Sequence, residues 1–399
     1  MEFDFYAPVP RFELEDRLNR LRSELTNSDD KWSMVIINNP INLYYLTGTI
    51  PEGILTVTKN EAILWVRKGY ERAKKESLFE DIRQMKSFRT VCDYFGQTPD
   101  TIYIEHGYAT IKWISMVQKY FRFYKYKDIA PILQKLRLNK SEYEIACIKK
   151  SGQIHSYVTE KIFPTLLEDG ISEAEICLKT ALEMVKRGSM GVNRFENPLG
   201  ESSSGICSFS ENGLYGLSFD SPDGCKGTYI AVQSIGSNNR KLKKGDIVFA
   251  DIPCGVAGYH TDKTVVYFYG KLSEHASGEM IKKAYNTCIE IEKKTAEMLK
   301  PNMTLSELYE YAVSLVPDEF KQGFMFGKKF IGHSIGLCMD EPPAIAKSFE
   351  EKLGCNQVFA LEPKIALDGI GIVGSENTYL VTENGGIRLT GDILPIIEL

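Results

Sequence analysis

Residues 245–264 read GDIVFADIPCGVAGYHTDKT. An apolar run ends on the carboxylate of Asp251, and a glycine-containing turn follows it. Asp262 then stands just before a second run of β-forming residues at 265–269. The pattern predicts two neighbouring strands of a hairpin, with one aspartate on each strand.

The same arrangement recurs near the C-terminus. An apolar run at 358–363 contains Glu362, and a second run at 375–381 contains Glu376. Any one of these acidic residues alone would be an ordinary strand-end or salt-bridged residue. Four such carboxylates together with the imidazole of His333 form the donor inventory of an oxygen-rich dinuclear metal site. Two divalent ions would balance four carboxylates that an empty pocket would crowd together.

The segments around these strands contain a weak internal repeat. One helix is expected over 154–167 and a second from Ser172. In the other copy a helix is expected over 280–299 and a second from Thr304. Each second helix begins with the pattern of a capping box. Two halves of this kind predict a pseudo-symmetric α+β domain with a site between the halves.

Residues 1–140 are predicted to form a separate α/β unit. Helices are expected over 14–25 and 130–138, and Ser141 with Glu144 forms a capping box that opens a new helix. We therefore place the domain boundary at residue 140. The strands expected in the first unit cover residues 34–37, 53–58, 61–66 and 101–105, with a tight hairpin between the second and third.

Composition excludes several classes of protein. The 399 residues carry a formal charge of −5, without the basic footprint that nucleic-acid binding requires. Residues 119–127 interleave basic and aromatic side chains, which we interpret as a strand with one wet face. Nine scattered cysteines without a CxxC pair indicate reduced thiols in the cytoplasm. No secretory leader or membrane-spanning run is expected.

From residue 141 to the end, the chain resembles the creatinase/aminopeptidase superfamily, whose fold is called pita-bread. Its members include methionine aminopeptidase, aminopeptidase P and prolidase. Residues 1–140 are similar to the amino-terminal domain of creatinase, aminopeptidase P and prolidase. The motifs that carry the resemblance are GDIVFADIPCGVAGYHTDKT, GHSIGLCMDEPP, ALEPKIAL and SENTYLVT, which occur in the order of the family. The resemblance implies an α/β creatinase-like domain followed by a pita-bread domain over 141–399.

The resemblance also implies two divalent metal ions, manganese or cobalt, with zinc or iron as alternatives. Asp251 would chelate one ion, and His333 with Glu362 would hold the other. Asp262 and Glu376 would bridge the two ions. Such a pair of ions activates a shared water and polarises the scissile carbonyl. Glu362, or a carboxylate beside it, would accept a proton from that water.

The function implied is that of an Xaa-Pro aminopeptidase or dipeptidase, which cleaves the N-terminal residue from short peptides. The amino-terminal domain points to this branch because minimal methionine aminopeptidases lack it. A homodimer is expected by resemblance. Two alternatives stay open: an enzyme on the same scaffold that acts on a small non-peptide substrate, and a catalytically silent peptide-binding module.

The chain departs from the family pattern at several positions. The histidine that the family has seven residues after the metal histidine is Asp340 here, and an upstream histidine aligns with Ser234. Family arginines correspond to Val265 and Gly374. A deprotonated aspartate cannot donate the hydrogen bond that a histidine donates. Asp340 would then bind a substrate amine, act as a base, donate when protonated, or form a salt bridge at the surface.

Two further patterns have competing interpretations. The loops at 200–205 and 220–227 would either line a substrate pocket or form solvent turns, since richness in glycine and serine does not decide. Residues 332–336 match the GxSxG elbow of α/β-hydrolases. In that class a histidine follows the nucleophile, but none of the five histidines follows Ser334. A serine esterase is therefore excluded.

Overall fold

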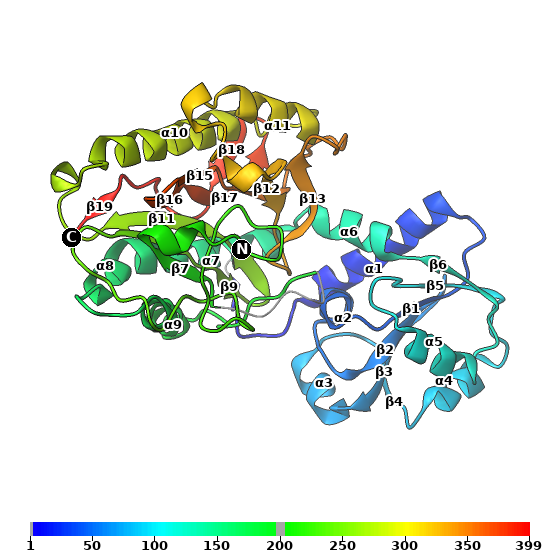
Figure 1. The fold of residues 1–399 in the computed structure, drawn as a ribbon. Coiled ribbons are helices and arrows are strands. Elements are labelled where there is room, and N and C mark those ends of the chain that lie inside the picture. Colours follow the sequence, from blue (N-terminus) through cyan, green and yellow to red (C-terminus); the bar gives the residue numbers. More distant parts are fainter. Residues whose placement is uncertain (1–2, 197–203) are drawn as a thin grey trace. The chain divides into compact units, whose positions relative to one another are not determined.

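The computed structural model describes residues 3–196 and 204–399 and divides into two compact units, Met1–Leu138 and Asn139–Leu399 (Figure 1). The boundary predicted at residue 140 lies beside this division. Both units combine helices with strands, which confirms the α+β class. None of the described helices has the length and apolarity that a bilayer crossing needs.

The first unit is built on a six-stranded sheet with the strand order β4-β3-β2-β1-β5-β6. Most of the apolar residues in its strands are buried, whereas Tyr126 in an edge strand is exposed. The strands are β1 (Val35–Ile37), β2 (Glu52–Val57), β3 (Ala62–Lys68), β4 (Ile82–Gln84), β5 (Thr101–Ile104) and β6 (Lys125–Asp128). The helices are α1 (Arg11–Ser28), α2 (Pro40–Thr47), α3 (Tyr70–Glu76), α4 (Phe88–Phe95), α5 (Ile111–Gln118) and α6 (Ala130–Leu138).

The prediction of one strand over 119–127 is wrong for its first half. Only Lys125–Asp128 forms a strand, because the chain leaves α5 through a turn. Phe121 and Phe123 pack from this turn into the core of the unit and are buried. Packing into the core therefore explains why aromatic residues stand at these positions, although no strand with alternating side chains forms there.

The second unit contains a long curved sheet with the order β13-β12-β14-β17-β11-β8-β7, and β18 and β19 pair with β17 and β11. Its strands are β7 (Ile206–Phe209), β8 (Ile247–Asp251), β9 (Cys254–Val256), β10 (Tyr259–Thr261), β11 (Lys263–Phe268), β12 (Phe330–Ser334), β13 (Glu341–Ala346), β14 (Val358–Leu361), β15 (Lys364–Leu367), β16 (Gly371–Gly374), β17 (Glu376–Thr382), β18 (Gly385–Arg388) and β19 (Ile397–Glu398). Its α-helices are α7 (Glu142–Tyr157), α8 (Phe163–Leu166), α9 (Glu173–Val185), α10 (Gly278–Glu297) and α11 (Leu305–Ser314).

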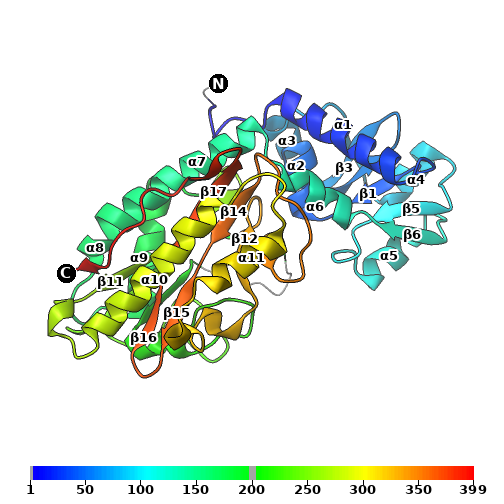
Figure 2. The same ribbon diagram turned by 90° about the horizontal axis from the view of Figure 1, so that it is seen from above.

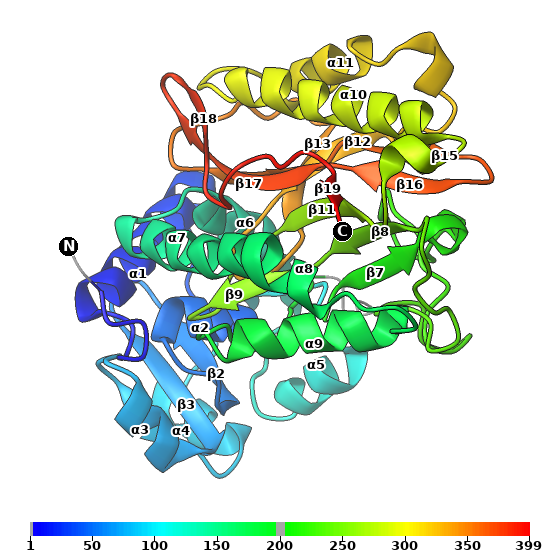
Figure 3. The ribbon, with the colours of Figure 1, turned by 90° about the vertical axis from the view of Figure 1, so that its left-hand side faces the viewer.

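Helix pairs cover the sheet from opposite sides. Figure 3 shows α10 and α11 on one side of the strands and α7, α8 and α9 on the other. Seen from above, α10 lies along the strands that it covers (Figure 2). Helices α7 and α9 contact β7, β9 and β10, whereas α10 and α11 contact β13, β15, β16 and β18. Each helix pair therefore belongs to one half of the predicted pseudo-symmetric domain.

Local capping explains where these helices begin. Ser141 and Glu144 form the predicted reciprocal capping box at the start of α7, and Thr304 forms another at the start of α11. Ser172 accepts a hydrogen bond from the backbone of Glu175, but no reciprocal bond completes that box. The helix expected over 154–167 is not separate, because α7 continues through a π-helical turn into α8.

The two halves meet at the centre of the sheet, where β11 pairs with β17. In one half, β8 pairs with β11 and the short hairpin β9–β10 joins them. In the other half, β14 pairs with β17 and the hairpin β15–β16 joins them. Thr264 lies opposite Glu376 across the central ladder. This register places the acidic ends of all four strands in one region.

Candidate metal centre

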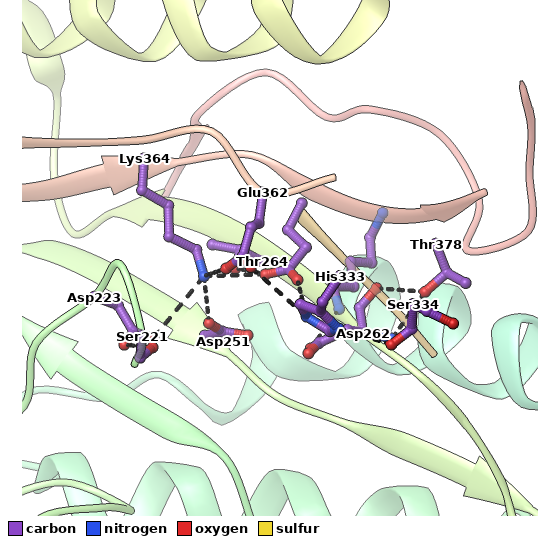
Figure 4. A network of polar contacts seen from close by, with 12 residues as sticks. Ser221, Asp223, Asp251, Asp262, Thr264, His333, Ser334, Glu362, Lys364 and Thr378 are labelled. Carbon is purple, nitrogen blue, oxygen red and sulfur yellow. Dashed lines mark hydrogen bonds and ion pairs between the residues drawn. The ribbon is translucent and has the colours of Figure 1, made fainter. Parts of the chain in front are cut away.

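The five predicted ligands lie in or beside neighbouring strands, and Figure 4 shows four of them, Asp251, Asp262, His333 and Glu362, gathered in one region. Asp251 ends β8, Asp262 lies between β10 and β11, and His333 lies within β12. Glu362 directly follows β14, and Glu376 begins β17. The sheet order brings these strands side by side, so residues that are 125 positions apart in sequence, from 251 to 376, share one site.

Three of the five side chains have the spacing of a metal site. One ligand atom each from Asp262, His333 and Glu376 lies within 4.8 Å of the other two. His333 Nε2 lies 3.6 Å from Glu362 Oε1 and 4.0 Å from Glu376 Oε1. The Nδ1 atom of the imidazole lies 3.2 Å from the carbonyl oxygen of Ser334, to which it can donate. That bond leaves Nε2 free to face the carboxylates.

Lys364 extends into the same cluster, and sequence reasoning missed it. Its side chain is fully buried, and its Nζ lies 2.7 Å from Asp251 Oδ2 and 2.9 Å from Glu362 Oε2. A third carboxylate oxygen, Glu376 Oε2, is 3.1 Å away. The signal was present in the quoted motif ALEPKIAL, because residues two apart in an extended chain lie on the same face. Glu362 and Lys364 have that spacing.

The charges of the cluster shift the pKa values of its members. Burial lowers the pKa of His333, but the charges of Asp340, Glu362 and Asp262 outweigh burial and raise it above the ordinary value. Burial and then the charge of Asp251 raise the pKa of Asp262 well above its usual range. Burial tends to raise the pKa of Asp251 as well, but the Lys364 ammonium and hydrogen bonds bring it below the ordinary value. These opposed shifts are those of a crowded set of carboxylates that attracts cations.

Asp223 is a second functional candidate that sequence reasoning did not single out. Its carboxyl group is buried, accepts a hydrogen bond from Ser221, and lies 4.0 Å from Lys364 Nζ. Burial raises the pKa of Asp223 to about 8, and the charge of Asp251 adds to the effect. Nothing in the sequence DSPDG distinguishes this aspartate from an ordinary turn residue.

A pocket of about 900 Å³ opens onto the cluster. Asp251, Asp262, His333 and Glu362 line it, while Glu376 is not among the lining residues. The pocket wall also includes Asp340, Ser234, Asp220, Ser221, Pro222, Lys328, Lys329 and the aromatic residues Phe195, Phe219, Phe330 and Phe349. Part of the loop predicted at 220–227 therefore lines this pocket. Residues 200–203 of the other predicted loop lie outside the described residues.

The two residues that replace family histidines both face the pocket. Asp340 lies between β12 and β13 and is exposed, and its charge acts on His333. Ser234 is buried in the pocket wall. Neither residue belongs to the close-spaced trio of metal-ligand atoms. Their position in the pocket wall allows contact with a substrate.

A layer of hydrogen bonds behind the site holds β17 in position. Glu292 of α10 accepts hydrogen bonds from Ser375, from Asn377 Nδ2 at 2.7 Å and from the Tyr379 hydroxyl at 2.6 Å. Burial raises the pKa of the Glu292 carboxyl. Because side chains alternate along a strand, Glu376 points the other way, where it accepts a hydrogen bond from Thr264 at 2.8 Å.

Ser334 lies inside the paired strand β12 rather than at a strand-to-helix turn. Its buried hydroxyl has no hydrogen-bond partner among the described residues. The strained elbow and the base that a serine nucleophile needs are therefore both missing at this position. This geometry agrees with the exclusion of a serine esterase.

Comparison with known proteins places both units in described families. The family described as Metallopeptidase family M24 matches residues 146–383. The Creatinase/Prolidase N-terminal domain matches residues 17–139. Both matches agree with the resemblance that the motifs carry, and with a creatinase-like unit followed by a pita-bread unit.

Individual relatives match along nearly the whole chain. The Xaa-Pro dipeptidase of Pyrococcus furiosus is 28% identical over 384 residues, which cover 94% of this chain and 98% of that protein. The solved structure of a prolidase from Pyrococcus horikoshii OT3 has a TM-score of 0.79 at 23% identity and covers 94% of this chain and 98% of its own. An Xaa-Pro dipeptidase from Bacillus anthracis has a TM-score of 0.80 at 22% identity, with 97% and 100% covered. At these identities the structures show a shared fold.

Proposed function

Because the chain belongs to metallopeptidase family M24, we propose that it is a metal-dependent Xaa-Pro dipeptidase or aminopeptidase. Its substrates would be short peptides with proline in the second position, from which it removes the N-terminal residue. The observation that carries this proposal is the convergence of Asp251, Asp262, Glu362 and His333 at the wall of one pocket, with Glu376 close behind them. The similarity to Xaa-Pro dipeptidases of two Pyrococcus species supports the Xaa-Pro branch.

The residues present fit a divalent ion. Asp262, His333 and Glu376 bring one ligand atom each within 4.8 Å of the others. Glu376 Oε1 is buried and has no hydrogen-bond partner among the described residues, as expected of an oxygen that binds an ion. One nitrogen among carboxylate oxygens suits manganese or cobalt, and zinc or iron are the alternatives. When bound, such an ion supplies Lewis-acid polarisation of the scissile carbonyl and a more acidic water.

The side chains in the pocket supply the remaining chemistry. Glu362 lines the pocket and would accept a proton from the attacking water. Asp340 would bind the α-amino group of the substrate, and Ser234 would donate a hydrogen bond from its hydroxyl. Lys329, which is exposed at the pocket, would attract the carboxylate of a short peptide. A dipeptide carries both charges that these side chains complement.

We also propose a homodimer in the cytoplasm, on the strength of the family resemblance. Sedimentation of the purified chain measures its oligomeric state. A sedimenting mass of one chain, at concentrations where the enzyme is active, would contradict the dimer. Fractionation of cells that express the chain measures its location in the cell.

The proposed activity is tested with metal-free protein to which manganese or cobalt is added back. Xaa-Pro dipeptides, longer Xaa-Pro peptides and peptides with an N-terminal methionine form the substrate panel. We expect metal-dependent release of the N-terminal residue from the Xaa-Pro substrates. The variants His333→Ala and Glu362→Gln should be inactive. His275→Ala, a histidine that packs against the Phe268 ring away from the site, should keep the activity.

Two outcomes would contradict the proposal. Metal-loaded protein without activity on any of these peptides would favour an enzyme for a small non-peptide substrate, for which Asp340 provides a changed pocket. Protein that binds neither metal ion would favour a peptide-binding module without catalysis. The metal content and the activity panel distinguish the two.

A further inference from the structure

Lys364 brings a fixed positive charge into the predicted dinuclear site. Its ammonium group lies at hydrogen-bond distance from three of the four carboxylates that the motifs assign to metal binding: 2.7 Å from Asp251, 2.9 Å from Glu362 and 3.1 Å from Glu376. We propose that this ammonium takes the place of one of the two cations, so that the chain binds one divalent ion per site instead of two. The inference rests on the proposed metal-dependent function and deepens it.

An ion and the ammonium nitrogen cannot share this position. A divalent ion such as zinc lies about 2.0–2.2 Å from the carboxylate oxygens that bind it. The Lys364 nitrogen stands 2.7–3.1 Å from three such oxygens and therefore occupies the space between them. An ammonium group has three hydrogens to donate and no acceptor, and here it meets three carboxylates. It donates hydrogen bonds to Asp251 and Glu362 and forms an ion pair with Glu376, all of which are groups that would otherwise ligate metal.

The two glutamates divide their oxygens between two positions. Glu362 directs Oε2 to Lys364, while its Oε1 lies 3.6 Å from His333 Nε2. Glu376 directs Oε2 to Lys364, while its Oε1 lies 4.0 Å from His333 Nε2 and has no hydrogen-bond partner among the described residues. One oxygen of each glutamate thus faces the ammonium and the other faces the imidazole. The position beside His333 remains for a single ion, with Asp262 as the further ligand.

The lysine side chain has little freedom to leave the site. It is 0% exposed, and its Nζ lies 5.9 Å from the centre of the Phe249 ring. Gly374 is its partner across the β15–β16 hairpin, and a Cβ added to that glycine would lie 2.5 Å from Lys364 Cγ. The aliphatic part of the Lys364 side chain therefore occupies the space that a side chain at position 374 would need. Asp223, 4.0 Å from Nζ, adds a further carboxyl group on this side.

Electrostatics favours one ion over two. With Lys364 in place, a second divalent ion near Asp251 would stand within a few ångströms of the ammonium, and like charges at that separation repel strongly in a buried site. With one ion beside His333, the carboxylates lie between the two cations. Each cation is then attracted to the oxygens that separate it from the other.

The number of bound ions tests this inference directly. Metal-free full-length protein is titrated with manganese, and the bound ion per chain is measured by equilibrium dialysis and metal analysis. We expect one ion per chain for the natural sequence and two for Lys364→Ala, which removes both the charge and the stem. Lys328→Met is the matched control, because Lys328 is a pocket lysine that pairs with Asp220 instead of the cluster. It should bind one ion.

Several results would overturn the inference: two ions, or none, on the natural sequence, or one ion on Lys364→Ala. If that variant does not fold, the electron paramagnetic resonance spectrum of the natural protein decides. A single isolated manganese signal at saturation supports one ion, and a spin-coupled pair contradicts it. These readouts do not depend on substrate. A chain with one ion and no Xaa-Pro activity would contradict the proposed function while it supports this inference.

Discussion

Glu292 of α10 and Asn377 of β17 are joined by a buried hydrogen bond of 2.7 Å, on the face of the strand opposite the candidate metal centre. The same asparagine accepts a hydrogen bond of 2.6 Å from Lys263 Nζ. The carboxylate thus connects a helix to the strand that carries Glu376. Glu292 therefore positions Glu376 through the strand and not through direct contact.

We predict that Glu292→Gln destabilises the second unit. The amide has one oxygen for the three groups that now donate to Glu292, so at least one buried donor loses its partner. The expected loss in the free energy of unfolding is about 1–3 kcal/mol, measured by urea denaturation. Glu290→Gln is the control, because Glu290 is exposed and its ion pair with Lys294 lies at the surface. This variant should lower stability much less than Glu292→Gln. Equal effects of the two variants would contradict the role of the buried network.

Gly374→Ala should lower stability because the added Cβ would overlap the Lys364 stem. Overpacking of this kind costs about 1–3 kcal/mol in the free energy of unfolding. Gly216→Ala provides the comparison, since a Cβ at Gly216 has no atom within 4 Å. Thermal unfolding of the two variants measures the difference. If Gly374→Ala were as stable as Gly216→Ala, the close packing around Lys364 would be refuted.

Asp340→Asn tests whether this residue binds the substrate amine. The substitution keeps the shape and removes the charge, so we expect KM for Xaa-Pro dipeptides to rise about 10-fold, equivalent to about 1.4 kcal/mol, with a smaller change in kcat. Asp220→Asn removes the other exposed pocket aspartate, which pairs with Lys328, and should change KM less. A peptide with an acetylated N-terminus should not distinguish Asp340→Asn from the natural enzyme. A loss of kcat alone would instead indicate a role as a base.

Metal removal should lower the melting temperature. The clustered carboxylates repel one another, and Lys364 compensates only part of their charge. A ligand that binds only the folded state at about 100 times its Kd adds about 2.7 kcal/mol of stability. A chelator should remove that amount, and added manganese should restore it. Should the chelator strip the metal and leave the melting temperature unchanged, the charge argument would be wrong.

Stability should fall as the solution is acidified below about pH 6.5. Burial, together with the charge of Lys263, lowers the pKa of His155 from 6.5 to about 3, and burial lowers the pKa of His260 to about 4. The unfolded chain binds these protons near pH 6.5, whereas the folded chain binds them only at lower pH. The free energy of unfolding therefore decreases as the pH falls from 6.5 toward 3. Each group contributes a slope of up to about 1.4 kcal/mol per pH unit.

His155→Gln should flatten this pH dependence. Urea denaturation at a series of pH values measures the slope for this variant and for the natural protein. A slope in His155→Gln equal to that of the natural protein would show that His155 is not the group responsible.

Local signals predicted the framework of the site well. Carboxylates at the ends of apolar runs marked β8 and β14, and the capping boxes at Ser141 and Thr304 marked the starts of α7 and α11. These features depend on residues a few positions apart, which a sequence shows directly. The sequence predicted a separate helix over 154–167, but α7 continues through a π-helical turn into α8. Such a turn leaves no clear mark in the sequence.

Features that depend on distant contacts were not predictable in the same way. Lys364 follows Glu362 at strand spacing, but only the neighbouring β8 and β17 reveal that Asp251 and Glu376 surround its ammonium. Asp223 stands in a turn-forming stretch, and its burial comes from the tertiary fold. The aromatic residues at Phe121 and Phe123 suited a strand and instead fill the core from a turn. In each case, packing against remote segments overrides the local pattern.

The pairing of β11 with β17 links the register of the central strands to the position of a metal ligand. Thr264 lies opposite Glu376 in this ladder, and a slip of one residue would rotate every side chain of β17 to the opposite face. Glu376 would then point toward α10, and Asn377 would take its place beside Asp262. A cation that binds Glu376 in the native register would therefore stabilise this register relative to the slipped one.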